Sequence, residues 1–322
     1  MKLRIGSRGS QLALWQTNHI ATLLRGQGHT VEIEIIKTTG DRLQEVTFAQ
    51  VGSKGMFTKE IEEALAEGRV DLAVHSLKDL PTELPEPFAL AATPPRVDPR
   101  DVLVSVKYAS LADLPPGAKV GTSSQRRKAQ LKALRPDIEA IEFRGNVDTR
   151  LRKLAEGQVD AILLAAAGLD RLEKTEWVRE RLAPNEFCPA AGQGSLGIET
   201  RKEDAATIAA VTFLDDPDTR FAVSVERAAL AALGGGCQVP IGVYVRPCAT
   251  PGQESIKDER WVEIHAVVAD PETGSTARIF KRVLEDHSKA SVIGGWIAEK
   301  LIEAGAGPLL ESAARPSAGA SA

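Results

Sequence analysis

Two seven-residue stretches of the chain are almost identical. Residues 65–71 read LAEGRVD and residues 154–160 read LAEGQVD, and each leads into a short apolar run. Around both stretches, short β-like runs alternate with longer helical ones, a pattern typical of parallel strands joined by helical crossovers. We therefore expect two related α/β lobes, although such a phrase can also recur by chance in α/β proteins.

Proline, glycine and small residues are concentrated in two segments that flank the second lobe. Residues 93–101 (TPPRVDPRD) contain prolines that disfavour regular structure, and residues 188–199 (CPAAGQGSLGIE) are rich in glycine and alanine. The chain is therefore expected to pass from the first lobe to the second and back, which makes a double hinge. Lobe 1 then comprises residues 1–94 and 195–215, and lobe 2 comprises residues 100–188.

The pattern changes after about residue 216. A helix at 218–233 and a glycine-rich turn are followed by alternating strands, a hairpin signal at DPETGS and a last helix. This order predicts a small α+β domain over residues 216–311. The tail at 312–322 has nothing to bury and is predicted to be disordered.

Composition narrows the functional classes. The chain has 322 residues, of which 43% are hydrophobic and 26% charged, as in folded proteins of two or three domains. It lacks a signal-peptide core and any run of about 18 apolar residues, so we expect a cytoplasmic protein that is neither secreted nor membrane-bound. Three cysteines without CxxC spacing fit a reducing compartment and predict no metal site.

Positive charge is concentrated between residues 121 and 153, where nine basic residues accompany four acidic ones. Thr122 and Ser124 lie where a strand feeds a helix, so their hydroxyls can cap the helix while free backbone N–H groups face an anion. Arg126 and Arg127 follow in the first helical turn, and a guanidinium fork matches a carboxylate. We expect these two arginines to bind an anion, whereas the lysines of the same region fit a solvated helix face.

Lobe 1 has a matching strand-to-helix turn. Arg8 lies in the turn SRGS, and ligands of open α/β sheets bind at the carboxyl ends of strands. Lys78 and Asp79 end the strand in VDLAVHSLKDLP, at the same kind of position, although Asp79 could equally cap a turn. His75 is interpreted as a packed residue, because no second histidine lies near it. The sequence thus predicts an anion-binding cleft between the lobes.

Two further segments are rich in glycine. Residues 40–60 form a long polar stretch typical of lids or disordered insertions, and its VGSKG lacks the GxxxxGK[ST] spacing of a nucleotide-binding loop. Cys237 lies in GGGCQVPIG (234–242), and a free cysteine is by default a small buried hydrophobe. The glycines leave a functional role for Cys237 open.

These motifs together resemble the porphobilinogen deaminase family, in order and along nearly the whole chain. The matching stretches are SRGSQLALWQ (7–16), VGSKGMFTKEIE (51–62), DLAVHSLKDLP (71–81), DPRD (98–101), VGTSSQRR (120–127), RGNVDTRL (144–151), ILLAAAGLDRL (162–172), PAAGQGSLGIE (189–199), ERAAL (226–230) and GGGCQVPIG (234–242). Only the part after about Gly242 is weakly diagnostic.

The resemblance implies an α/β fold with two periplasmic-binding-protein-like lobes joined by a double hinge, plus a small C-terminal α+β domain. It implies a transferase, hydroxymethylbilane synthase, which joins four porphobilinogen molecules head to tail with release of ammonia in porphyrin, heme and other tetrapyrrole biosynthesis. The product grows on a dipyrromethane cofactor that a thioether attaches to Cys237, and hydrolysis then releases it. A monomer is usual in the family.

The resemblance also assigns site residues by motif match. Asp79 is the catalytic carboxylate, which stabilises the cation left by ammonia and passes protons. The cofactor-binding residues are Cys237, Lys78, Asp79, Thr122, Ser124, Arg126, Arg127, Arg144 and Arg150. The substrate-binding residues are Arg8, Ser10, Arg144, Arg150 and Arg171, with Lys54 and Phe57 in a lid loop at 42–57. A lysine often found shortly before the family's GGKG is Gln50 here, so a ligand role for that position is in doubt.

Two alternatives account for part of the pattern. A non-catalytic solute-binding or effector-sensing module would share the two lobes and the anion cleft but would have no use for Cys237 or Asp79. Nucleic-acid binding through QRRKAQLK (125–132) is opposed by the 4% aromatic content and by the net charge of -4. Neither alternative explains the ordered motifs.

Overall fold

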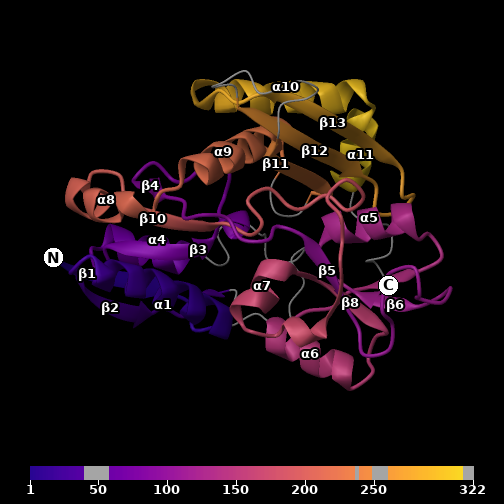
Figure 1. Ribbon diagram of the computed structural model, residues 1–322, viewed down its shortest axis with the longest axis horizontal. Coiled ribbons are helices and arrows are strands. Elements are labelled where there is room, and N and C mark those ends of the chain that lie inside the picture. The colour runs from indigo at the N-terminus through magenta and orange to yellow at the C-terminus, as the bar shows by residue number, and fades with distance from the viewer. Residues whose placement is uncertain (40–57, 236–238, 249–259, 315–322) are drawn as a thin grey trace.

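The computed structural model describes residues 1–39, 58–235, 239–248 and 260–314. These residues form three β-sheets with helices packed on them (Figure 1). Two sheets are mixed and have five strands each, and the third is antiparallel and has three. The prediction of two α/β lobes joined by a double hinge, with a small α+β domain at the C-terminal end, is confirmed. Within the described ranges, no helix is both long and apolar enough to span a bilayer.

The first sheet has the strand order β2-β1-β3-β10-β4. Its strands are β1 (Lys2–Ser7), β2 (Thr30–Ile35), β3 (Leu72–Ser76), β4 (Phe88–Ala92) and β10 (Leu196–Arg201). The strand β1 pairs in parallel with β2 and β3, whereas β10 runs antiparallel to β3 and β4. The α-helices among the described residues of this lobe are α1 (Gln11–Gly26), α4 (Lys59–Ala66) and α8 (Ala205–Val211).

The second sheet repeats this arrangement in the order β7-β6-β8-β5-β9. Its strands are β5 (Asp101–Val104), β6 (Lys119–Gly121), β7 (Glu139–Ile141), β8 (Ala161–Ala165) and β9 (Val178–Arg181). The strand β6 pairs in parallel with β7 and β8, whereas β5 runs antiparallel to β8 and β9. The helices are α5 (Gln125–Leu134), α6 (Val147–Ala155) and α7 (Ala166–Arg171).

The repeated phrase has the same structural role in both lobes. It ends a helix, α4 or α6, places a glycine at positive φ (69° at Gly68, 78° at Gly157) and leads into a central strand. Glycine is favoured at such a position because side chains with a Cβ are strained there. The aspartates that close the phrase, Asp71 and Asp160, each accept a 2.8 Å hydrogen bond from a backbone N–H of the adjacent parallel strand. The shared letters therefore encode a shared helix-to-strand connection.

The chain crosses between the two lobes twice. It leaves the first sheet after β4 and enters the second at β5, and it returns between β9 and β10. The two crossing segments lie against each other, because a Cβ on Gly194 (φ 89°) would lie 2.6 Å from the carbonyl oxygen of Val97. Only glycine permits this approach, so the hinge segments are in direct contact.

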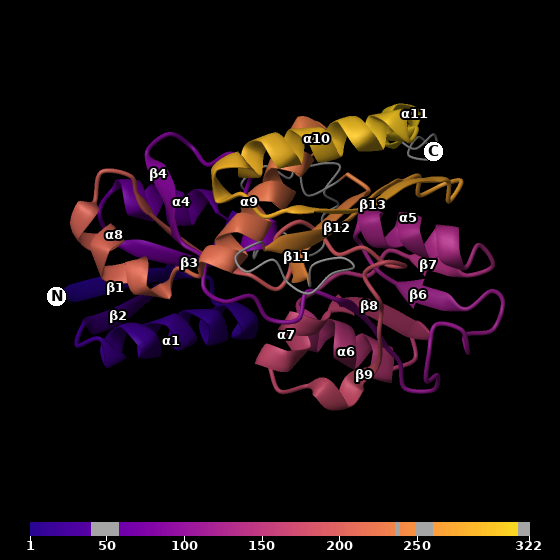
Figure 2. The same cartoon turned by 45° about the horizontal axis from the view of Figure 1, so that its top comes forward.

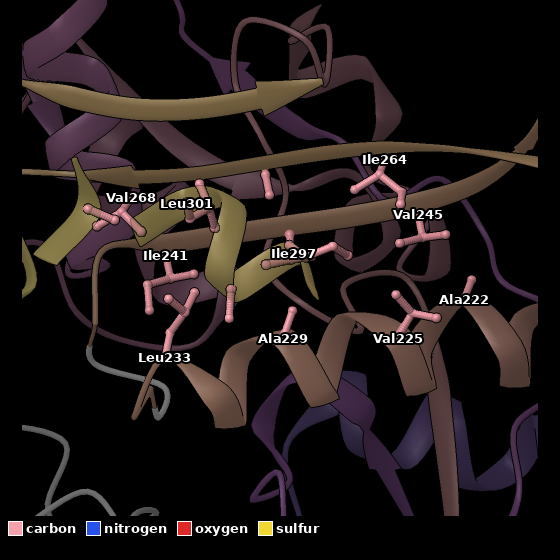
Figure 3. Close-up of a cluster of buried hydrophobic side chains, with 14 of the residues drawn as sticks. Ala222, Val225, Ala229, Leu233, Ile241, Val245, Ile264, Val268, Ile297 and Leu301 are labelled. Carbon is pink, nitrogen blue, oxygen red and sulfur yellow. The ribbon is translucent and has the colours of Figure 1, made fainter. Parts of the chain in front are cut away.

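The third sheet belongs to the C-terminal domain and has the order β11-β12-β13. The elements of the domain are α9 (Pro217–Ala232), β11 (Ile241–Cys248), β12 (Trp261–Ala269), β13 (Thr276–Leu284), α10 (Ala290–Glu303) and α11 (Ala306–Ala314). The helices α9 and α10 pack together on this sheet (Figure 2). In the core between them, Val225 and Ala229 of α9 meet Ile297 and Leu301 of α10 and Ile264 of β12 (Figure 3).

The sequence pattern does not predict α11. Leu309 and Leu310 of this helix pack against the domain core, so the chain remains ordered to Ala314. Residues 312–314 therefore continue a helix rather than a disordered tail, and the rest of the predicted tail lies outside the described residues.

Candidate active site

The loop after β1 leads directly into α1 and contains Arg8 and Ser10. The side chain of Ser10 caps α1 by accepting a hydrogen bond from the N–H of Ala13 at 3.3 Å. Arg8 is half-buried at the carboxyl end of β1. The predicted strand-to-helix turn is therefore present in lobe 1.

Lys78 and Asp79 lie in a single 3-10 turn, η1 (Leu77–Asp79), directly after β3. Leu77 anchors this turn, because its side chain is buried and its N–H donates to the carbonyl oxygen of Ser195 at 3.0 Å. Asp79 is exposed and Lys78 partly buried. Loss of solvent around the ammonium lowers the pKa of Lys78 to about 8, against the opposing attraction of Asp79. The turn thus places a carboxylate beside a lysine whose ammonium group loses its proton more readily than usual.

The matching turn of lobe 2 lies at the start of α5. Ser124 is the N-cap, and its hydroxyl accepts a hydrogen bond from the N–H of Arg127 at 3.4 Å. Thr122 is buried, and its hydroxyl accepts from the N–H of Ser124 at 3.3 Å. These hydroxyls fix the backbone at the start of the helix that carries the two predicted arginines.

Arg126 and Arg127 share one buried carboxylate, that of Asp101 at the start of β5. Arg126 contacts it at 2.6 and 3.1 Å, and Arg127 contacts it at 2.8 Å through Nε and again through a second nitrogen. Asp101 is fully buried, and the attraction of both arginines overcomes its desolvation and lowers its pKa to about 2. Gln193 of the returning hinge segment also donates to Asp101 at 3.1 Å. One carboxylate therefore ties α5 to both hinge segments.

Two other arginines of lobe 2 have different partners. Arg144 donates from Nε to Glu142 at 2.7 Å. Arg150, on α6, donates from Nε to the carbonyl oxygen of Gly145 at 2.6 Å. Burial, and then the nearby charge of Arg127, lowers the pKa of Arg150 to about 10, while the carboxylate of Asp79 opposes the shift. The attraction of Asp79 of lobe 1 therefore acts on the pKa of Arg150 and, in the same direction, on that of Arg127, both in lobe 2.

Arg171 ends α7 and is 7% exposed. It donates to the carbonyl oxygen of Gly194 at 2.9 Å, and burial lowers its pKa to about 10. In the part of the chain that the structure describes, neither Arg150 nor Arg171 has a carboxylate within ion-pair distance. Arg171 is buried and Arg150 is half-buried. A cation removed from water without a counter-charge is costly, so this pair is suited to carboxylates supplied by a ligand.

Several predicted residues lie outside the described part of the chain. They are Cys237, Lys54 and Phe57, together with Gln50. The glycine-rich turn can be followed on both sides of the cysteine: the N–H of Gly235 donates to the carbonyl oxygen of Leu230 at the end of α9, and Val239 packs against the domain core just before β11. The sequence around Cys237 thus connects α9 to β11.

The lysines of α5 and His75, for which the sequence predicts no ligand role, have partners within the protein. Lys128 pairs with Glu142 at 2.7 Å, and Lys132 donates to a backbone carbonyl at 3.1 Å. His75 is buried and lies 2.9 Å from Glu199. These contacts agree with a solvated helix face for the lysines and a packed position for the histidine.

Sequence reasoning missed the role of Asp101 and of a second buried ion pair at the hinge. Arg96 contacts Glu226 of α9 at 2.6 and 3.2 Å, and Glu226 also accepts from the N–H of Gly192 at 2.7 Å. This pair attaches the third domain to both hinge segments. The motif DPRD was visible in the sequence, but only the fold shows that Asp101 lies between two arginines.

Arg150 and Arg171 fit a polycarboxylated cofactor. Among the described residues neither arginine has a carboxylate partner, and the charges of Lys78 and Arg127 act in the same region as that of Asp79. A dipyrromethane brings several carboxylates, which is the charge that these residues lack.

The chain matches two family models in succession. Residues 3–209 match "Porphobilinogen deaminase, dipyromethane cofactor binding domain", and residues 220–303 match "Porphobilinogen deaminase, C-terminal domain". The solved L-cystine solute receptor of Neisseria gonorrhoeae aligns with 66% of this chain and 84% of its own, at 17% identity and a TM-score of 0.37, a likeness too weak to say anything about function.

Curated relatives align with almost the entire chain. The porphobilinogen deaminase of Nitratidesulfovibrio vulgaris (strain DSM 19637 / Miyazaki F) is 48% identical over 316 residues, which are 96% of each chain. Those of Chromobacterium violaceum and Brevibacillus brevis are 47% and 45% identical, over 96% and 98% of this chain and 97% and 98% of their own. The chain therefore belongs to the porphobilinogen deaminase family.

Proposed function

We propose that this chain acts as a hydroxymethylbilane synthase in which Asp79 catalyses and the arginines of lobe 2 hold the growing product. As a transferase of tetrapyrrole biosynthesis, the chain condenses four porphobilinogen molecules head to tail with release of ammonia. A bound dipyrromethane cofactor supplies the pyrrole to which the first unit is joined, and hydrolysis releases the linear tetrapyrrole.

The observation that carries the residue assignment is the placing of Asp79, in the turn after β3 of lobe 1, within electrostatic range of Arg127 and Arg150 of lobe 2. Its attraction raises the pKa of both arginines, against the lowering that burial causes. A carboxylate beside several cations, at the ends of strands from two lobes, can act on a substrate whose own carboxylates the cations bind.

The number of cations follows from the charge of the substrate. Each porphobilinogen carries an acetate and a propionate, so every added unit brings two more carboxylates to the same site. A charge-assisted hydrogen bond contributes about 1.5 to 3 kcal/mol, and an unpaired buried carboxylate costs more than that. Arg8, Ser10, Arg144, Arg150 and Arg171 are assigned to the substrate, together with Lys54 and Phe57 of the predicted lid loop.

The cofactor is assigned to polar residues of the two turns and to Arg144 and Arg150, which are also assigned to the substrate. Lys78, Asp79, Thr122, Ser124, Arg126, Arg127, Arg144 and Arg150 bind it, and Cys237 attaches it through a thioether. Most donors of Arg126 and Arg127 already have protein partners: both bond Asp101, Arg126 also donates to the carbonyl oxygen of Cys188 and to Gln193, and Arg127 donates to the carbonyl oxygen of Leu163. Their contribution to the cofactor is therefore mainly their positive charge.

Asp79 stabilises the positive charge left on the substrate carbon when ammonia departs, and it accepts the proton lost when the new bond forms. Lys78, whose pKa is about 8, lies beside it and can hold a carboxylate at neutral pH.

The finer organisation is proposed as follows. Residues 1–94 and 195–215 form lobe 1, residues 100–188 form lobe 2, and the C-terminal domain begins at residue 216 and includes α11, which ends at Ala314. The protein is a cytoplasmic monomer that binds no nucleic acid.

An Asp79→Asn variant tests the catalytic assignment. The variant keeps the shape of the side chain but cannot stabilise a cation or accept a proton, so turnover of porphobilinogen should fall by at least about a hundredfold. Ammonia release and tetrapyrrole formation are both measured, with Asp113→Asn, an exposed aspartate of lobe 2, as a control that keeps wild-type turnover. Wild-type turnover in Asp79→Asn would contradict the assignment.

A further inference from the structure

We propose that Trp15 of α1 is a positioning residue for Arg171 of α7. Its indole face holds the guanidinium across the boundary between the lobes, ready for a carboxylate of the substrate. This inference rests on the proposed function, because it takes the ligand of Arg171 to be porphobilinogen or the growing product.

The two side chains meet where the lobes pack together. The Cζ atom of Arg171 lies 6.0 Å from the centroid of the Trp15 ring, within the usual range of a cation–π contact. The helices that carry them, α1 and α7, lie next to each other in both views (Figures 1 and 2). A Cβ on Gly168 of α7 would lie 3.8 Å from Leu12 of α1, so the helix contact is close. Arg171 therefore belongs to lobe 2 but is positioned in part by lobe 1.

Arg171 depends on this aromatic face because, among the described residues, its guanidinium has few other partners. Its neighbour Asp170 pairs instead with Arg181 at 2.6 Å. The hydrogen bond from Arg171 to the carbonyl oxygen of Gly194 fixes one end of the guanidinium. The electron-rich face of an indole attracts a cation without neutralising it, so the charge remains available to a carboxylate.

His19 holds the indole in its orientation. It lies one helical turn after Trp15, and the two rings stack with centroids 5.2 Å apart and an interplanar angle of 11°. Partial burial, and then the charge of Arg171, lowers the pKa of His19, which weakens the repulsion between the imidazole and the guanidinium. Trp15, His19 and Arg171 thus form one stacked group that spans the boundary between the lobes.

A Trp15→Leu variant removes the aromatic face and keeps an apolar side chain. Loss of a partly desolvated cation–π contact should raise KM for porphobilinogen about fivefold to thirtyfold, with kcat within about twofold of the wild type. Trp15→Phe retains an aromatic ring that attracts a cation less strongly than indole does. Its KM should therefore lie between that of the wild type and that of Trp15→Leu. Trp177→Leu is the matched control, because Trp177 packs against a core cluster of lobe 2: it should lower the unfolding temperature and leave KM unchanged.

A double-variant cycle shows whether Trp15 acts through Arg171. Arg171→Gln should raise KM, and adding Trp15→Leu to it should raise KM no further. If Trp15→Leu is not recovered folded, the cycle is run with Trp15→Phe. A wild-type KM in Trp15→Leu, or a full additional effect in the double variant, would overturn the inference. An inactive wild type would instead overturn the proposed function.

Discussion

The carboxylate of Asp101 is predicted to be the main electrostatic support of lobe 2. It is fully buried and receives hydrogen bonds from Arg126, Arg127 and Gln193. Its replacement by asparagine keeps the size of the side chain but leaves two buried guanidinium groups without their shared counter-charge. Removing one partner of a buried ion pair costs about 3 to 5 kcal/mol in general.

The depressed pKa of Asp101 gives a second, lower figure for the free energy by which this carboxylate stabilises the fold. The folded value is about 2 and the ordinary value is 3.8. Because the folded pKa is depressed, the stabilisation is complete at neutral pH and is lost as the pH falls through 3.8 toward 2, and the shift corresponds to about 2 kcal/mol. Protonation leaves a smaller defect than Asp101→Asn, since both oxygens of the carboxylic acid can still accept hydrogen bonds, whereas the amide NH2 of asparagine can only donate. The expected loss for the variant therefore lies between about 2 and 5 kcal/mol.

Urea unfolding at pH 7 and at pH 3 measures this loss. Asp101→Asn should be destabilised at pH 7, and the difference from the wild type should shrink at pH 3. Asp137→Asn is the matched control, because Asp137 pairs with Arg135 of the same lobe on the surface and should change stability far less. An Asp101→Asn variant as stable as the wild type at pH 7 would refute this reasoning.

Three further predictions concern the site and the hinge. Arg150→Gln should lower kcat/KM for porphobilinogen about tenfold to hundredfold, because it removes a charge-assisted bond to a substrate carboxylate, and steady-state kinetics would show no change if Arg150 binds no carboxylate. Raising the pH from 7 to 9 should raise KM as Lys78, with a pKa of about 8, loses its proton, and a Lys78→Arg variant that retained this rise would exclude Lys78 as its source. Gly194→Ala should destabilise the protein by about 1 to 3 kcal/mol in thermal unfolding. The control is Gly28→Ala, which should cost less, because Gly28 has a similar φ but a Cβ there would meet no neighbour within 4 Å. Equal losses of stability in the two variants would contradict the close approach at Gly194.

The sequence was sufficient to predict the repeated architecture because that information is local. The phrase at 65–71 and 154–160 encodes a helix end and a glycine at positive φ, and these two features depend only on nearby residues. The bond from the closing aspartate to the adjacent parallel strand is a long-range contact, which the repeat marks but does not by itself predict. The alternation of strands and helices and the proline-rich crossing likewise follow from short-range preferences. The fold class could therefore be predicted without a structure.

The electrostatic organisation of the site could not be predicted in the same way. Arg126 and Arg127 were identified as anion ligands from their position in the first turn of a helix, but their link to Asp101 joins residues about 25 positions apart. The contact between Trp15 and Arg171 likewise exists only because the two lobes pack together. Such pairs depend on tertiary packing, which sequence spacing does not determine.

The central claim is that Cys237 carries the dipyrromethane cofactor, and intact mass spectrometry with peptide mapping tests it directly. The account predicts an adduct of two pyrrole units on the peptide that contains Cys237, and the loss of this adduct in Cys237→Ser. Cys248→Ser should retain it, and Cys188, which is buried with a pKa raised to about 12, should remain unmodified. An unmodified Cys237 thiol in enzyme that converts porphobilinogen to the linear tetrapyrrole would contradict the account.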